Sequence, residues 1–249
     1  MSELQLKLSA EEIDRIVGFL GYGQPSAPVW FIGIEEGLGK MDSEDIEKNL
    51  KARASFAETM DLREAHLRLL LKGKPIDVEK KPPPTQVWQY MAKIMRAYGG
   101  NKDWIRLESA KEYIRSRLGR LHGETFLTEL SPIPSKNGKD KTWLNWFRRE
   151  DPGLNSKILQ RAERLKQALV QNRPPLVMCY GNGNNLPEKF ADLLGVEWQP
   201  VCPNVCASRD YRRLLLPFFG TGQLKHSVIE EIIHRGLLGS VAALSGTHS

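Results

Sequence analysis

The chain has 249 residues, of which 41% are hydrophobic and 27% are charged, and its formal net charge is +6. Such a length can bury a sizeable core without disulfide staples. We expect one domain over 1–249, with an N-terminal helix in 1–24, a core in 25–240 and a frayed tail in 241–249. The basic balance favours an anionic partner, commonly nucleic acid, although a merely basic soluble protein fits the charge equally well.

The cysteines are Cys179, Cys202 and Cys206. An odd count in a chain of this length indicates the reducing cytoplasm, and it is too small for a closed tetrahedral metal site. We therefore expect no metal and no other cofactor. The N-terminus lacks the apolar core of a signal peptide, and no run approaches the ~20 apolar residues of a membrane span, so we expect no membrane partner.

A capping box at Ser9–Glu12 precedes apolar residues at helical spacing and predicts a first helix. The chain then reaches Val29–Gly39, where large apolar residues suit a strand buried on both faces and glycines allow a tight turn or a close ligand. Glu35 and Glu36 would stand where this strand passes to the helical pattern from Ser43 onward. Open α/β sheets bind ligands at such positions.

Helical spacing continues to about Leu71, as one long helix or two shorter ones. The basic, proline-rich Lys72–Pro84 is expected to be an irregular surface connection. Thr85 should then cap a helix that ends at Gly99–Gly100. Another helix is expected over about 107–121.

A second strand is predicted over Thr125–Ser131, stopped by Pro132 and the proline that follows it. The next segment, 136–149, mixes cations with aromatic side chains, which is typical of proteins that hold single-stranded or extruded nucleotides. Its aromatic residues are Trp143, Trp146 and Phe147. Equally, these rings suit core anchors of a short helix.

Further elements are expected as a helix over 155–172, a strand over Leu176–Tyr180, a helix over about 187–194, a strand over Arg213–Phe219 and a helix over about 225–238. Strands separated by helices predict an α/β fold with three layers and a central four-stranded parallel sheet. Right-handed crossovers would bring the carboxyl ends of all four strands to one rim.

The loops at this rim supply carboxylates, amides, hydroxyls, glycines and an aromatic pair, which suit a nucleotide or a base. The candidate catalytic residues are Glu35, Glu36 and His226, which is expected near the start of the last helix and beside the rim. The candidate substrate-binding residues are Gly33, Gly37, Ser131, Pro132, Asn182, Asn184, Phe218, Phe219, Gly220, Thr221, Gly222 and Gln223.

The order and character of these loops resemble the uracil-DNA glycosylase superfamily over roughly Val29 to Leu238. Gly33–Gly37 is similar to its first motif, Leu130–Pro132 to its second, and Leu216–Leu224 to the loop that enters the DNA minor groove. The resemblance implies hydrolysis of the N-glycosidic bond of a uracil-type or damaged base flipped from DNA. We expect single- or double-stranded DNA as the partner, and a monomer.

Members of that superfamily carry a histidine in the last loop, whereas this loop has Phe219-Gly-Thr-Gly, so His226 about one helical turn later is the candidate for its role. Members with an iron–sulfur cluster need four cysteines, so no cluster is expected here. Because hydrolysis passes through a cationic sugar, a carboxylate beneath the ring can orient water and stabilise charge. This role falls to Glu35 or Glu36, and Phe218 or Phe219 would stack on the base.

Other interpretations remain open. Both glutamates could cap the following helix, with nothing cleaved. The chain could be a catalytically inactive nucleic-acid-binding module, as the missing loop histidine suggests. It could also be a small-molecule nucleotide enzyme that uses Gly181–Asn185, a partial dinucleotide fingerprint. Binding that weakens steeply with salt concentration would indicate DNA as the ligand, because binding of a mononucleotide responds only weakly to salt.

Overall fold

The computed structural model describes residues 6–38, 41–135, 140–181, 183, 185–220 and 222–238. The expected frayed tail and the 136–139 part of the cation-rich segment fall outside these ranges. So do three candidate binding residues, which are Asn182, Asn184 and Thr221.

The described chain forms an eight-stranded sheet in the order β3-β1-β6-β2-β7-β10-β9-β8. Its strands are β1 (Gly21–Tyr22), β2 (Val29–Gly37), β3 (Thr59–Met60), β6 (Thr125–Ser135), β7 (Leu176–Tyr180), β8 (Gln199–Cys202), β9 (Val205–Ala207) and β10 (Arg213–Leu216). The neighbours β6, β2, β7 and β10 run parallel. These four are the strands that the sequence predicts, so the α/β fold is confirmed.

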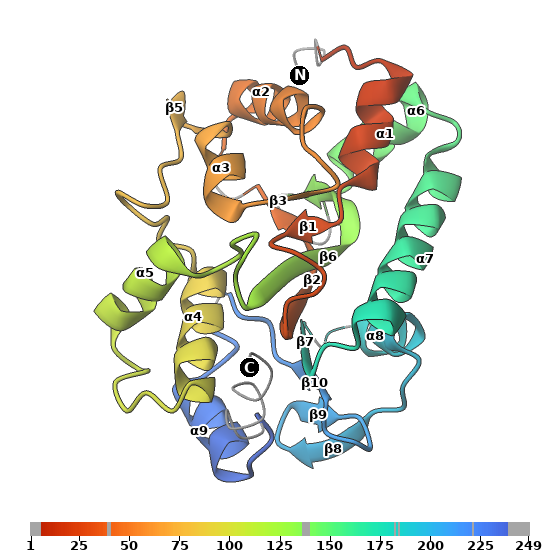
Figure 1. Ribbon diagram of the computed structural model, residues 1–249. Coiled ribbons are helices and arrows are strands. Elements are labelled where there is room, and N and C mark those ends of the chain that lie inside the picture. The colour runs from red at the N-terminus through yellow and green to blue at the C-terminus, as the bar shows by residue number, and fades with distance from the viewer. Residues whose placement is uncertain are drawn as a thin grey trace, which may run out of the picture.

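Helices cover both faces of the sheet, with α4, α5 and α9 on one side and α1, α6, α7 and α8 on the other (Figure 1). The helices are α1 (Ala10–Gly18), α2 (Ser43–Arg53), α3 (Leu62–Leu67), α4 (Gln86–Tyr98), α5 (Leu107–Ser116), α6 (Thr142–Glu150), α7 (Leu154–Asn172), α8 (Leu186–Leu194) and α9 (His226–His234). The capping box before α1 is formed as predicted.

Strand β2 lies at the centre of the core because its side chains alternate between two apolar layers. Val29 and Phe31 pack into the cluster that includes α4, α5 and α9, whereas Trp30 and Ile32 pack into the cluster of α7 and α8. All four side chains are fully buried. A strand covered on both faces needs a continuous apolar run rather than an alternating one, which is the pattern found here.

The sheet is larger than the four-stranded parallel sheet expected from the sequence, and it is mixed. Antiparallel pairing adds β1 beside β6 and β9 beside β10, while β3 and β8 form the edges. These additional strands have two to four residues each. They are too short for an alternating pattern to be recognised in the sequence.

Strand β6 continues through Pro132 and Pro134, where the sequence predicted that it would stop. The pairing of β2 with β6 shifts register at this end, so that Glu35 faces Ser131 and Gly37 faces Ser135. A bulge of this kind accommodates residues that cannot donate a ladder hydrogen bond, and proline is such a residue.

The basic segment expected to be irregular begins with a separate hairpin of β4 (Leu70–Leu71) and β5 (Lys74–Pro75). Its turn residues Lys72 and Gly73 have φ values of 55° and 70°. Positive φ at both positions is the geometry of a type I′ turn, which suits the twist of a two-residue hairpin.

The pattern from Ser43 to Leu71 contains two helices, α2 and α3, which is the second of the two expected arrangements. Other helix predictions need correction. Helix α5 ends at Ser116 rather than near 121. Thr85 precedes α4 but makes no side-chain capping bond. The aromatic residues of α6 are buried against α1 and α2, so they are core anchors and not stacking platforms; they are Trp143, Trp146 and Phe147.

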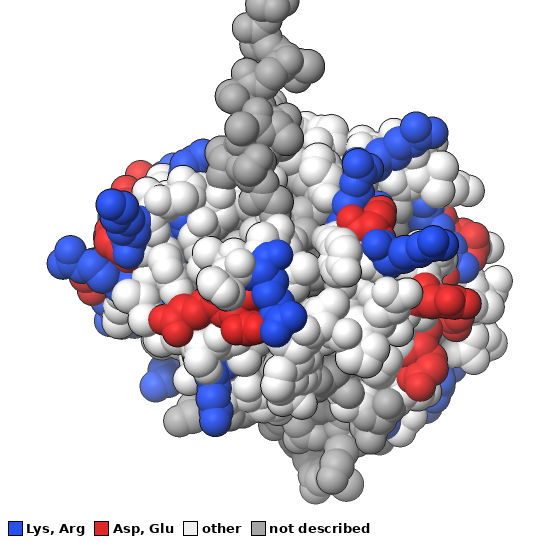
Figure 2. Space-filling model, turned by 90° about the horizontal axis from the view of Figure 1, so that it is seen from below, with Lys and Arg blue, Asp and Glu red and all other residues white. Residues whose placement is uncertain are grey.

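Charges of both signs share the face of the molecule that is seen from below (Figure 2). Lysine and arginine groups lie beside aspartate and glutamate groups, with uncharged residues between these clusters. The described residues of this face therefore form no continuous basic surface, and the surplus positive charge is not gathered there.

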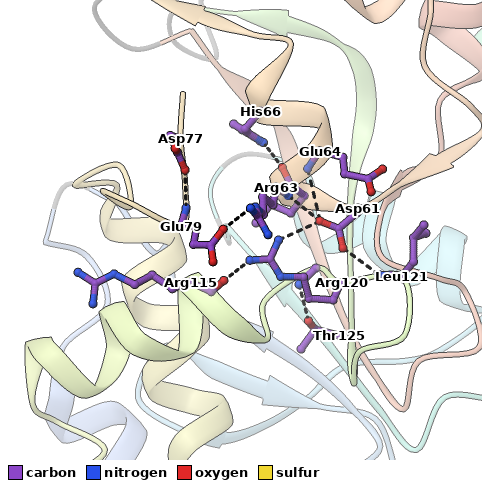
Figure 3. Close-up of polar contacts among 12 residues, drawn as sticks. Asp61, Arg63, Glu64, His66, Asp77, Glu79, Arg115, Arg120, Leu121 and Thr125 are labelled. Atoms are coloured by element: carbon purple, nitrogen blue, oxygen red, sulfur yellow. Dashed lines mark hydrogen bonds and ion pairs between the residues drawn. The ribbon is translucent and has the colours of Figure 1, made fainter. Parts of the chain in front are cut away.

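Asp61, the N-cap of α3, joins this helix to the loop that enters β6 (Figure 3). Its carboxylate lies 2.8 Å from Arg120 Nη1, with both side chains 15% exposed, and accepts the Leu121 N–H at 3.3 Å. Within the same loop the Gly119 N–H donates to Thr125 Oγ1 at 2.8 Å. These contacts fix where β6 begins.

Arg161 of α7 connects β6 to the helices on the face of the sheet opposite α4, α5 and α9. Its side chain is 2% exposed and donates to the carbonyl oxygens of Phe19 at 2.8 Å and Glu129 at 2.9 Å, and to that of Leu20 at 3.3 Å. Burial lowers the pKa of Arg161 to about 10. The guanidinium thus compensates backbone oxygens that α7 would otherwise cover.

We expect Arg161→Met to lower the free energy of unfolding by about 3 kcal/mol, because it leaves buried carbonyl oxygens without donors. Arg164→Met, on the same helix, is the matched control. Arg164 forms a solvent-exposed pair with Glu58, so its loss should cost at most about 1 kcal/mol. Urea unfolding measures both, and equal losses would contradict the assigned role of Arg161.

Candidate functional site

The carboxyl ends of β2, β6, β7 and β10 meet at one edge of the sheet, because these neighbours are parallel. This is the edge at which open α/β sheets bind ligands. The candidate side chains form three groups: the glutamates of β2 and β6 with their partners, the phenylalanines of the last loop, and His226 with Lys93. The sequence analysis selected neither Glu129 nor Lys93.

Glu36 forms an ion pair with Arg53 of α2 and accepts a hydrogen bond from the Tyr22 hydroxyl at 3.4 Å. The Arg53 side chain is 10% exposed, so Glu36 compensates a buried cation. The N-cap of α2 is Asp42, whose side chain accepts the Asp45 N–H. The interpretation in which both glutamates cap the following helix is therefore wrong.

Glu35 is held differently. Its carboxylate accepts a hydrogen bond from the Ser135 hydroxyl on the neighbouring strand β6, and the residue is half-buried. Of the two adjacent glutamates, Glu35 is thus tied across the strand pair, whereas Glu36 is tied to a helix and to β1.

Glu129 of β6 belongs to the site although the sequence analysis did not select it. Its Oε1 accepts a hydrogen bond from the Tyr180 hydroxyl at 2.9 Å, whereas its buried Oε2 has no hydrogen-bond partner among the described residues. Burial raises the pKa of Glu129 to about 8, and the charges of Glu36 and Glu35 add to this shift. Glu129 is therefore a neutral carboxylic acid near pH 7.

Gly33 makes this arrangement possible. A Cβ atom at Gly33 would overlap both Glu129 Oε2 and the Tyr180 hydroxyl. The first glycine of the predicted loop thus makes room for a carboxyl group of the neighbouring strand. Strands β2, β6 and β7 each contribute one member of this contact.

The carboxyl groups of Glu36 and Glu129 come from adjacent parallel strands and have opposite environments. Glu36 forms an ion pair with a nearly buried guanidinium, whereas Glu129 is desolvated and its pKa is raised. Pairs of carboxyl groups in contrasting surroundings are candidates for an acid and a base in a hydrolytic site.

A cavity of about 30 Å³ adjoins Glu36, Arg53 and His66. This volume is enough for roughly one water molecule and too small for a nucleobase. His66 Nδ1 lies 2.8 Å from the Leu62 carbonyl oxygen, and burial lowers the pKa of His66 to about 4. The cavity therefore combines a carboxylate, a guanidinium and a neutral imidazole.

The two phenylalanines of the last loop have different surroundings. Phe219 is fully buried and stacks on Tyr180, with ring centres 4.5 Å apart and planes at 17°. Phe218 is half-buried, and its ring leaves no space for a Cβ at Gly220. Phe218 is therefore the ring with a surface left for a ligand, and the expectation that Phe219 stacks on a base is wrong.

The other described candidates lie at the ends of β2 and β6 or in the last loop. Ser131 Oγ accepts the N–H two residues further along at 3.2 Å, and Pro132 beside it is half-buried. Gly37, Gly222 and Gln223 are exposed, and the space around Cβ positions at both glycines is open.

His226, the third predicted catalytic residue, lies apart from the carboxyl pair. It is the first residue of α9, and its Nε2 lies 2.8 Å from Lys93 Nζ of α4. The rings of Tyr90 and Trp104 flank it, with centres at 5.7 Å and 6.0 Å. Desolvation, together with the charge of Lys93, lowers the pKa of His226.

No protein-family model and no curated protein matches the chain. In the part of the chain that the structure describes, no three His, Cys, Asp or Glu side chains gather as a metal site would require. None of the described helices has the length and apolar character needed to cross a membrane.

Gly33→Ala should lower the free energy of unfolding by about 2 kcal/mol, because the new methyl group displaces Glu129 and Tyr180 from a packed contact. Gly37→Ala is its control on the same strand, where a Cβ meets nothing within 4 Å. If chemical denaturation found the two variants equally stable, the proximity of Gly33 to the carboxyl group would be disproved.

Glu129 should also make stability depend on pH. Its folded-state pKa of about 8 lies above the ordinary value of 4.5, so between these limits the folded state binds more protons and stability falls as pH rises. Between pH 6.5 and about 8, the free energy of unfolding of wild type should fall by about 2 kcal/mol relative to that of Glu129→Gln. Urea unfolding midpoints of both proteins, measured across this pH range, test the direction of this change. A difference between the two midpoints that stays constant with pH would contradict the prediction.

Proposed function

We propose that the protein is a DNA glycosylase-type hydrolase, which cleaves the N-glycosidic bond of a uracil-type or damaged base extruded from DNA. The observation that carries this proposal is that the adjacent parallel strands β2 and β6 carry two carboxyl groups in different surroundings, Glu36 in an ion pair with Arg53 and Glu129 with a pKa raised by burial. The resemblance of the loops to the uracil-DNA glycosylase superfamily supports it. The run of four parallel strands agrees with what that resemblance implies.

The two carboxyl groups have complementary roles in this reaction. As the bond from C1′ to the base nitrogen breaks, positive charge develops on the sugar, and the Glu36 carboxylate stabilises it. A water molecule adds to C1′ and passes its proton to Glu36. The departing base takes the proton of Glu129, which has one to give because it is neutral near pH 7.

Substrate binding requires that the base leaves the stack, which costs a few kcal/mol unless it is damaged, mismatched or single-stranded. Phe218 provides a half-buried ring for stacking at the rim. The net charge of +6 favours the phosphate backbone. Because the face in Figure 2 has no continuous basic surface in its described part, DNA should bind elsewhere, at the rim of the strand ends.

The test is abasic-site formation, measured by alkaline cleavage of single- and double-stranded oligonucleotides that carry uracil, hypoxanthine, xanthine or an oxidised base. Wild type should release one of these bases, and the rate should fall as pH rises through about 8. Glu129→Gln should slow release at least about 100-fold, because glutamine has no proton to give. Glu35→Gln is the matched control, and its rate of base release should fall less than about tenfold, because the Ser135 hydroxyl binds the Glu35 carboxylate and Glu35 acts on Glu129 only through its charge.

Circular dichroism and DNA affinity confirm that each variant is folded and binds. If Glu129→Gln retained the wild-type rate, the assigned acid would be wrong. If wild type released no base but bound DNA in a salt-sensitive manner, the protein would be a nucleic-acid-binding module. If it bound no DNA at all, the small-molecule nucleotide enzyme would remain.

A further inference from the structure

Lys93 and His226 form a pair of bases on the same face of the sheet as Glu129. Lys93 Nζ and His226 Nε2 are 2.8 Å apart, and they come from the middle of α4 and the start of α9. The Lys93 residue is 8% exposed and His226 is half-buried. Two basic groups so close together can share a hydrogen bond only while one of them is neutral.

The positive charge of this pair has no carboxylate in contact with it among the described residues. The charged group that acts on His226 from its own helix is Glu230, an exposed residue. Near α4, Asp103 is occupied by Arg96 at 2.8 Å. Desolvation lowers the pKa of Lys93, as it does that of His226. A buried cation without an anionic partner is costly, and an anion at this position would remove that cost.

The surroundings of the pair also favour an anion. Helix α9 has nine residues, its N-cap makes no side-chain capping bond, and its first turn contains no acidic residue. Backbone N–H groups and the helix dipole therefore attract negative charge at this end. The half-buried rings of Tyr90 and Trp104 flank the imidazole and leave it accessible in part.

We propose that Lys93 and His226 bind one phosphoryl oxyanion, which either a nucleic-acid phosphodiester or free phosphate can supply. On binding, His226 takes up one proton from solvent, so that its Nε2–H and the Lys93 ammonium group both donate to the oxyanion. The direct hydrogen bond between the two bases is then replaced by two charge-assisted bonds to phosphate.

A series of ring contacts connects this position with Glu129. It runs from His226 through Tyr90 to the buried Phe219 and Tyr180, with ring centres 5.7 Å, 6.4 Å and 4.5 Å apart in turn. Tyr180 in turn donates to Glu129. Use of this site to hold a DNA strand rests on the proposed function, whereas binding of phosphate does not.

The first experiment is an NMR titration with inorganic phosphate from about pH 6 to about pH 8, in which His226→Gln assigns the imidazole signal. Phosphate should raise the pKa of His226, and the dissociation constant should rise by up to about tenfold per pH unit above the pKa of the unliganded state. Lys93→Met keeps the apolar stem and should weaken binding at least about tenfold. Lys189→Met removes an exposed lysine from α8 and should leave binding unchanged.

The second experiment measures binding of a single-stranded oligonucleotide against salt concentration. If the source is a phosphodiester, Lys93→Met should reduce the slope of log K against log salt by about 0.7. An unchanged slope with lost phosphate binding would indicate a free phosphate or mononucleotide ligand. If phosphate left the pKa of His226 unchanged and the slope were also the same, the proposal would be overturned. Both readouts remain informative if the protein releases no base.

Discussion

The contact between Gly33 and the Glu129 carboxyl group is the constraint on which the carboxyl end of the sheet depends. The carboxyl group occupies its place because Gly33 has no side chain, and the Tyr180 hydroxyl satisfies one of its oxygens. From the other face, Arg161 holds the carbonyl oxygen of the same glutamate. Three strands and one helix thus meet at a single residue, and a change in any of them moves a titratable group.

This packing determines where protons reside. A buried carboxyl group is stable when it is neutral, and the nearby charge of Glu36 strengthens that preference for Glu129. Glu36 keeps a cationic partner in Arg53, so the two carboxyl groups have different surroundings. On the face of the sheet covered by α4 and α9, Lys93 and His226 are bases in contact. The proposed hydrolysis would use the carboxyl pair, and the proposed phosphate site would use the basic pair.

Local patterns in the sequence were enough to predict the central strands, the capping box before α1 and the edge of the sheet at which the parallel strands end. The continuous apolar run of β2 is evidence of burial on both faces, which is typical of an interior strand in a sheet with helices on both sides. Glu129 was missed because one acidic residue inside an apolar strand has no periodic signal. The partnership of Glu36 with Arg53 was missed because it joins residues 17 positions apart, and only the packing of α2 against the sheet brings them together. The edge strands are too short to be recognised before their partners are known.

The most direct test of the account is the protonation state of Glu129, measured by ¹³C NMR of glutamate side-chain carboxyl carbons as a function of pH. Comparison of wild type with Glu129→Gln assigns the signal. In wild type, one carboxyl carbon should titrate with a midpoint near 8, and its signal should be absent from the variant. A midpoint near the ordinary value of 4.5 would show that Glu129 is ionised at neutral pH, and it would contradict both the carboxyl pair and the hydrolytic function built on it.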